Sequence, residues 1–337
     1  MNSDQPTDPT TSRHAGVRPG VRSVNATASS SQATPDDMDD STTTPKPSTL
    51  HGGLPSVENA AFIDVHYHAN PDAYHRRHGA SAAAALYQAA NGWVVLKNHL
   101  GCTAAQAWEA RRQGLPVSGS LVLNEIAGGL DTRAVQRSLC QHDAPLRFIV
   151  HLPTVTGRVH QSHLARSLSH PILGAEPIQP LTISDEQGRL RPQVLDLLRM
   201  SRDYPLVISS GHADGPEVLR LVEAAAQIGV PRLMLNQPAN PLTGLDAEAL
   251  RGLGDLPFLY IEQTALTYLL GYQPWEDFAE VLGTLPRVVY SSDLGQTSQM
   301  DVAHWLAQSR QWFEQAGLGA ERVDDVIRRW PLEMLQL

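Results

Sequence analysis

Short apolar runs alternate with helix-like stretches along most of this 337-residue chain, and this alternation limits the possible folds more than any other feature. Runs with the length and composition of buried strands are Phe62–His68 and residues 93–99, 117–124, 147–154, 206–212, 233–238, 258–263 and 288–293. Helices are expected at residues 81–90, 103–113, 131–142, 192–202, 216–228, 246–253, 275–282, 301–315 and 320–329. Eight such β–α units over about 250 residues are typical of a (β/α)8 TIM barrel. An open doubly wound sheet is the alternative, but no glycine-rich phosphate motif follows the first strand.

The first part of the chain has a different composition. Residues 1–55 are rich in Ser, Thr, Pro and Asp and contain few large apolar side chains. Such a segment buries too little surface to offset the entropy lost on ordering, so we expect a disordered tail. Residues 56–337 are then left for a single barrel domain.

Composition also excludes several classes of protein. The formal net charge is −9, and no run of Lys and Arg indicates a nucleic-acid binder. No apolar run approaches the ~20 residues of a membrane helix, and the N-terminus lacks the apolar core of a signal peptide. Cys102 and Cys140 form no close pair, which favours free thiols in the cytoplasm. We expect a cytoplasmic protein that binds a small molecule, with a homo-oligomer left open.

The first strand has polar side chains where a buried parallel strand should be apolar. Strict alternation along Phe62–His68 would place Asp64, His66 and His68 on one face. Two imidazoles two residues apart can chelate one metal ion, and Asp64 could orient one of them. Two core histidines satisfied by hydrogen bonds are the plainer alternative.

The other strands carry polar residues at the same end. These residues are Lys97, His99, Asn124, Glu125, His151, His212, Asn236, Gln237, Glu262, Gln263 and Asp293. Catalytic groups of TIM barrels cluster at the C-terminal ends of the strands, so this distribution predicts an active site.

With these motifs in this order, the chain from Phe62 onward resembles the amidohydrolase superfamily of metal-dependent TIM-barrel hydrolases, and within it a bacterial branch. The resemblance implies a divalent metal held by His66, His68, His212 and Asp293, with zinc first and manganese or iron as alternatives. It also implies that Asp293 is the general base and that His212 is a ligand or polarises the substrate.

The chain departs from the superfamily pattern at two strand ends. Gln237 stands where a histidine is usual, and a neutral amide is a poor zinc ligand, so we expect Gln237 to contact substrate. His151 stands where a bridging Lys or Glu is usual, and we do not expect it to be a ligand. One metal is therefore favoured over two, unless Lys97 is carbamylated.

Other candidates surround this centre. Lys97 and His99 point the same way along their strand, and a buried lysine can act as a base or polarise a carbonyl; an ion pair with Asp64 or Glu262 is the alternative. Arg76 and Arg77 follow the first strand and could bind an anionic substrate group, or they are solvated loop charges. The long connection 155–189 carries His160, His163 and His170, which we do not expect to be ligands.

These observations predict a metal-dependent hydrolase that uses a metal-activated water on a small polar amide, lactone or ester. A metal-dependent decarboxylase of a small carboxylic acid is the second hypothesis. A catalytically inactive barrel that binds a small ligand is the third.

Overall fold

The computed structural model describes residues 55–158 and 162–337. Its strands are β1 (Phe62–His68), β2 (Gly92–Lys97), β3 (Val117–Ser118), β4 (Ser120–Val122), β5 (Phe148–His151), β6 (Leu206–Ser209), β7 (Leu233–Leu235), β8 (Leu259–Thr264) and β9 (Val288–Ser291). Its α-helices are α1 (Ala80–Ala89), α2 (Ala104–Arg112), α3 (Thr132–Leu139), α4 (Ile172–Ala175), α5 (Pro192–Asp203), α6 (Gly215–Ile228), α7 (Ala247–Arg251), α8 (Ala265–Leu269), α9 (Trp275–Thr284), α10 (Val302–Gln315), α11 (Ala320–Asp324) and α12 (Trp330–Leu335). Short helical turns are η1 (Val57–Asn59), η2 (Glu125–Ala127) and the π-helical η3 (Asp325–Arg329). The expected tail lies outside the described residues, except for its last residue.

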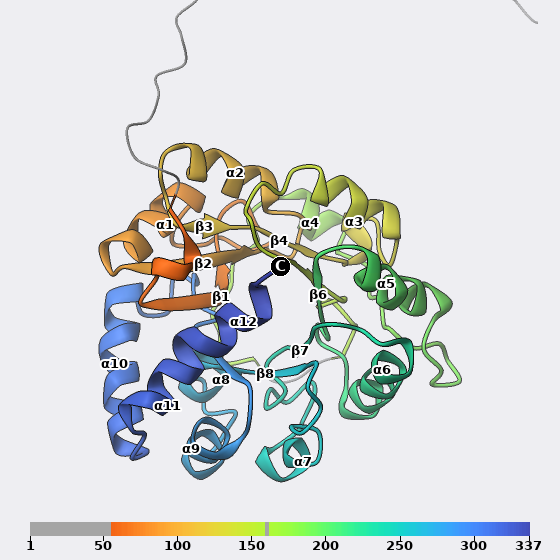
Figure 1. The fold of residues 1–337 in the computed structure, drawn as a ribbon. Coiled ribbons are helices and arrows are strands. Elements are labelled where there is room, and N and C mark those ends of the chain that lie inside the picture. Colours follow the sequence, from red (N-terminus) through yellow and green to blue (C-terminus); the bar gives the residue numbers. More distant parts are fainter. Residues whose placement is uncertain (1–54, 159–161) are drawn as a thin grey trace, which may run out of the picture. The chain divides into compact units, whose positions relative to one another are not determined.

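The strands close into a barrel surrounded by helices (Figure 1). Every pairing from β1 to β3 and from β4 to β9 is parallel. β3 and β4 are two parts of one barrel strand, interrupted at Gly119, where a Cβ would lie 2.6 Å from the Cα of Ala104. The ring closes where Tyr67 pairs with Leu294 and the amide of Asp293 donates to the carbonyl of His66 at 2.9 Å. The predicted TIM barrel is confirmed, and it is the fold that the resemblance to the amidohydrolase superfamily implies.

Two apolar layers stabilise the barrel. One fills its interior with side chains from alternate strand positions: Ile63, Val65, Trp93, Val95, Ile149, Val207, Met234, Tyr260 and Val289. The other layer packs the outer faces of the strands against the helices, with Phe62 and Tyr67 from β1 and Tyr87 from α1. Met334 and Leu335 of α12 join the inner layer, and Leu335 accepts a hydrogen bond from the amide of Arg147, just before β5. The helix α12 therefore lies at the end of the barrel where the strands begin.

A break in the register of β1 changes which side chains enter the barrel. Asp64 pairs with Val94 and Tyr67 with Leu96, so three residues of β1 match two of β2. The extra residue reverses the alternation of side chains in the manner of a β-bulge. The expectation that Asp64 shares a face with His66 and orients an imidazole is therefore wrong. Asp64 instead accepts hydrogen bonds from the hydroxyl of Tyr87 and from the backbone amides of His66 and Ser292.

All the predicted strands and helices are present, with ends shifted by a few residues. The helix expected at 320–329 continues through η3 and α12, and β4, β5, β6, β7 and β9 end earlier than predicted because their last residues turn into the site. The short helices α4 and α8 were not predicted, since four or five residues carry too little periodicity to identify a helix. Within residues 55–158 and 162–337, no helix combines the length and apolar character needed to cross a membrane.

Candidate metal centre

Two imidazoles and one carboxylate meet at the C-terminal mouth of the barrel. The Nε2 atoms of His66 and His68 lie 3.1 and 3.2 Å from the same oxygen, Oδ1 of Asp293. His66 and His68 project from β1, and Asp293 follows β9 across the closing seam. All three side chains are buried, and Nε2 of His66 has no hydrogen-bond partner among the described residues despite its short distance to Asp293. Two ring nitrogens and a carboxylate oxygen are donors that Zn²⁺ and similar ions accept, so this set fits a divalent metal.

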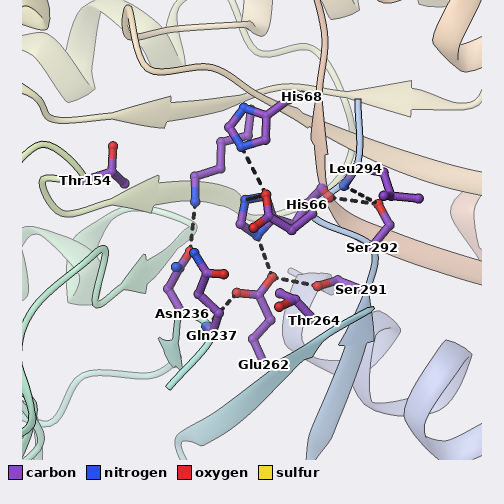
Figure 2. Close-up of polar contacts among 12 residues, drawn as sticks. His66, His68, Thr154, Asn236, Gln237, Glu262, Thr264, Ser291, Ser292 and Leu294 are labelled. Carbon is purple, nitrogen blue, oxygen red and sulfur yellow. Dashed lines mark hydrogen bonds and ion pairs between the residues drawn. The ribbon is translucent and has the colours of Figure 1, made fainter. Parts of the chain in front are cut away.

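Carboxylates hold the second nitrogen of each imidazole. Nδ1 of His66 lies 2.9 Å from Oε1 of Glu262, at the end of β8 (Figure 2). Nδ1 of His68 lies 3.2 Å from Oδ2 of Asp72, in the loop after β1. Such partners fix the tautomer and the orientation of metal-binding histidines, leaving Nε2 free to coordinate. The sequence identified Glu262 as a polar residue near the end of a strand, but it did not predict the contact of Glu262 with His66. No sequence pattern indicated a role for Asp72.

Further hydrogen bonds fix these two carboxylates. Glu262 accepts from the hydroxyl of Ser291 at 2.7 Å and from the amide of Gln237 at 3.0 Å (Figure 2). Asp72 accepts from the amide of His99 at 2.6 Å and from Nε of Arg76 at 2.6 Å. The orienting groups are therefore as constrained as the groups that they orient.

The backbone turns Asp293 into the barrel. Its φ of +51° is in the left-handed region, which non-glycine residues seldom occupy. The amide of Asp293 donates to the carbonyl of His66, which holds this turn against β1. Two residues later, Gly295 continues the turn with a φ of +117°. Unusual backbone of this kind persists where surrounding contacts impose it and is concentrated at functional sites.

The charges of the centre depend on one another. Burial lowers the pKa of His66, but the carboxylates of Asp293 and Glu262 outweigh it and raise that pKa to about 9. Burial likewise opposes ionisation of Asp293, yet His66 and His68 hold its pKa well below its usual value. The ionised carboxylate of Asp293 therefore faces two imidazoles, and its negative charge favours a positive charge beside it.

Lys97 and His99 lie beside this centre. Lys97 is fully buried and its Nζ donates to Oδ1 of Asn236 at 2.8 Å. Burial lowers the pKa of Lys97 to about 8, against the pull of nearby carboxylates. The ring of His99 stacks on that of His68, with centroids 4.9 Å apart, and its Nδ1 lies 3.0 Å from the hydroxyl of Thr154. An ion pair of Lys97 with Asp64 or Glu262, the alternative considered above, is not present.

His212 and Gln237 form a second pair across the mouth. Nε2 of His212 lies 3.1 Å from the side-chain amide nitrogen of Gln237. Burial and the charge of Lys97 lower the pKa of His212 to about 3, so the ring is neutral. The ring of His212 lines the same cavity as His66, His68 and Asp293 but is not one of the group whose ligand atoms lie within 4.8 Å of one another, so its role as a ligand stays a prediction.

The arginines after β1 do not present free charges to a substrate. Arg76 is buried, and its guanidinium binds the carboxylate of Asp72. Arg77 lies outside the cavity and donates to the backbone carbonyls of Thr297 and Gln299. The exposed position of Arg77 matches the alternative of a loop charge, and substrate binding by Arg77 stays a prediction.

His68, Asp72 and His99 form a second group with metal-ligand atoms close together. Nη2 of Arg76 lies 3.2 Å from Nδ1 of His68 and 2.5 Å from Oδ2 of Asp72. A guanidinium therefore already neutralises this group, so it does not fit a cation. The residues support one ion, at His66, His68 and Asp293.

The remaining histidines lie apart from the ligand atoms. His151 is buried inside the barrel with Nδ1 2.9 Å from the hydroxyl of Ser209, while its Nε2 has no partner among the described residues. His163 contacts the carbonyl of Leu270 at 2.7 Å, and His170 accepts from the amide of Ile172. His160 lies outside the described residues.

A cavity of about 460 Å³ opens above the metal centre. Its inner end is lined by His66, His68, Lys97, His99, His212, Gln237 and Asp293. Most of the residues named as candidates from the sequence therefore face one space, together with Arg76 at its edge.

Comparison with known proteins gives a family without an assigned activity. The model of a family of unknown function, DUF6282, matches residues 61–262. The sequence matches none of the curated proteins with which it was compared.

Several solved structures have a similar chain path. A probable 2-pyrone-4,6-dicarboxylic acid hydrolase from Acinetobacter baumannii, with citric acid bound, is 13% identical with a TM-score of 0.49, over 81% of this chain and 98% of that chain. Organophosphorus hydrolase from Deinococcus radiodurans is 13% identical with a TM-score of 0.43, and the match covers 80% of this chain and 92% of that chain. N-acetyl-D-glucosamine-6-phosphate deacetylase from Mycobacterium smegmatis is 16% identical with a TM-score of 0.38, and the match covers 79% of this chain and 71% of that chain. At these values the likeness transfers no activity, so function has to be read from the site itself.

Proposed function

The chain belongs to the DUF6282 family, and we propose that it is a metal-dependent hydrolase of the amidohydrolase type that acts on an amide, lactone or ester. The observation that carries this proposal is the approach of two Nε2 atoms to one oxygen of Asp293, while Glu262 and Asp72 hold the opposite nitrogens. Carboxylate–histidine–metal arrangements of this kind orient ligands in metalloenzymes.

His66, His68 and Asp293 would hold one divalent ion, with zinc as the first candidate and manganese or iron as alternatives. When bound, such an ion lowers the pKa of water to about 7 and polarises a carbonyl oxygen. Asp293 is ionised at neutral pH and can accept a proton at a carboxylate oxygen.

The remaining polar groups of the cavity have separate roles. Nε2 of neutral His212 accepts a hydrogen bond from the side-chain amide of Gln237, and the second N–H of that amide can donate to a substrate carbonyl. Lys97, fixed by Asn236, supplies a positive charge against the negative charge that develops during acyl transfer. His99 supports His68 by stacking and lines the inner end of the cavity.

The decarboxylase hypothesis had two grounds: arginines at the mouth that would receive a carboxylate substrate, and Gln237 in place of the usual histidine. Arg76 is neutralised by Asp72, and Arg77 binds the loop carbonyls, so neither supplies the free charge that the hypothesis needed. Hydrolysis is therefore the function that we retain. The two cysteines are free, which is compatible with a reducing compartment such as the cytoplasm.

The first test measures metal and turnover on the full chain. We expect one Zn, Mn or Fe per chain by inductively coupled plasma mass spectrometry, and none in a His66→Ala/His68→Ala variant. We also expect the metal-loaded protein to hydrolyse at least one member of an ester, lactone and amide panel. Carbon dioxide release from carboxylic acids without hydrolysis would favour the decarboxylase. Bound metal without any turnover would favour the inactive ligand-binding barrel.

A further inference from the structure

The loops around the cavity add a group of aliphatic side chains to its lining, beside polar residues such as Thr156, Ser162 and Asn240. Seven aliphatic side chains line it: Leu164, Leu168, Leu173, Ile178, Leu242, Leu266 and Leu270. Leu164 to Ile178 come from the long connection around α4. Leu242 comes from the loop after β7, Leu266 from α8, and Leu270 from the C-terminal end of α8. Leu168 is 44% exposed although it lines the cavity, so an apolar surface there faces water until something covers it.

The described part of the long connection is fixed over the mouth. The amide of His75 donates to the carbonyl of Ser167 at 3.0 Å, and the amide of Ser169 donates to Ala73 at 3.0 Å. Leu168 is thereby paired with Tyr74 of the β1 loop in an antiparallel bridge. The apolar wall is therefore attached to the loop that also carries Asp72, the partner of His68.

Two of the three arginines that line the cavity are paired with carboxylates. Arg76 binds Asp72, and Arg158 binds Asp214 and Glu217 at 2.9 and 2.8 Å. Arg166 is exposed at the outer edge, with its guanidinium 5.1 Å from the centre of the Tyr74 ring. Along the outer wall a ligand therefore meets Arg166 as the one lining arginine without a carboxylate partner among the described residues, while Lys97 lies at the inner end, where a substrate carbonyl would be placed. One exposed cation at the edge does not provide a paired site for a dicarboxylate.

The volume is large for a short substrate. One water occupies about 30 Å³ in the liquid, so 460 Å³ corresponds to about fifteen waters. An acetyl ester at the metal centre would leave most of the apolar wall in contact with water, whereas a longer hydrocarbon group would cover it.

We propose that this outer wall is an acyl- or alkyl-binding subsite, and that the substrate is a neutral ester, lactone or amide with a medium-length hydrocarbon group. This rests on the proposed hydrolysis at the same centre and narrows its substrate class. The hydrophobic part determines which substrate is accepted, and the groups at the inner end act on the carbonyl. The "small polar substrate" expected from the sequence is replaced by one that is polar at one end only.

Binding of 1-alkanols tests the subsite without turnover. Calorimetry on the full chain, zinc-loaded, with 1-hexanol to 1-decanol should show affinity that rises about fourfold per methylene until the cavity is full. Leu168→Ser and Leu242→Ser should each weaken 1-octanol binding about fivefold to tenfold. Ile172→Ser is the matched control, because Ile172 is 59% exposed on the same connection but does not line the cavity.

Turnover then separates the two proposals. Rising kcat/KM from acetyl to octanoyl esters, reduced toward the acetyl value in Leu168→Ser, would support the subsite and the hydrolase together. Alkanol binding with this chain-length dependence but without hydrolysis of any ester would support the subsite and overturn the hydrolase. Hydrolysis with equal kcat/KM for short and long esters, or alkanol affinity that does not change with length, would overturn the subsite and leave the hydrolase standing.

Discussion

Glu262 and Asp72 determine how the two imidazoles of β1 point. Each accepts from Nδ1 of one histidine, so each histidine presents Nε2 toward Asp293. Without these carboxylates either ring could rotate or change tautomer, and the pair would no longer face the same oxygen. The candidate centre therefore depends on five side chains, of which three would hold the ion.

Glu262→Gln should weaken metal binding while the barrel stays folded. The amide keeps the shape of Glu262 and can still accept from Ser291, but it cannot hold the N–H of His66 with a full negative charge. We expect about 10- to 100-fold lower zinc affinity, measured by competition with a chromophoric chelator.

Glu333→Gln is the control for this substitution. Glu333 accepts from the hydroxyl of Tyr260 at 2.9 Å in α12, at the opposite end of the barrel. The zinc affinity of the Glu333→Gln variant should equal that of the wild type. Equal affinities in both variants would show that Glu262 does not orient His66.

At the scale of elements, the sequence predicted which segments are strands but not how their residues are aligned. Eight apolar runs are local signals, so the strands could be counted. The bulge in β1 has no such signal, because Asp64, His66 and His68 keep the same spacing with or without it. The contact between Glu262 and His66 similarly depends on barrel closure between β1 and β9, which composition does not encode.

The seam between β1 and the segment after β9 should tolerate little change. At Gly295 the φ is +117°, and a Cβ would lie 1.9 Å from the carbonyl oxygen of His68. Gly295→Ala should therefore destabilise the fold by more than about 3 kcal/mol, since it combines a backbone clash with a disfavoured conformation. Urea unfolding monitored by circular dichroism measures this loss.

Gly317→Ala provides the comparison, because Gly317 also has a positive φ, +67°, but has open space around its Cβ position. Only the conformational cost remains there, about 1–2 kcal/mol. If the two variants lose the same stability, the close contact at the seam does not limit the fold.

For the molecule as a whole, the candidate metal centre lies at the seam that closes the barrel. The centre joins the first strand of the barrel to the segment after the last, so an ion bound there links the two ends of the β-ring. The position of the polar strand ends predicted this meeting, since every parallel strand points its C-terminus to the same mouth. The identity of the groups that face the substrate depended on loops, where Arg77 turns away and Leu168 turns toward the cavity.

Metal removal should therefore lower the melting temperature of the whole barrel. An ion that binds only the folded state stabilises it by about 2.7 kcal/mol at 100 times its Kd, which corresponds to roughly 5–10 °C for a domain of this size. We expect this difference between zinc-loaded and chelator-treated protein in thermal unfolding, and its loss in His66→Ala/His68→Ala. A His163→Ala/His170→Ala variant, which also lacks two histidines but keeps the centre, should retain it. A melting-temperature shift that persists in His66→Ala/His68→Ala would place the stabilising ion elsewhere in the chain. Loss of the shift in this variant, but not in His163→Ala/His170→Ala, would tie the closure of the barrel to the candidate catalytic centre.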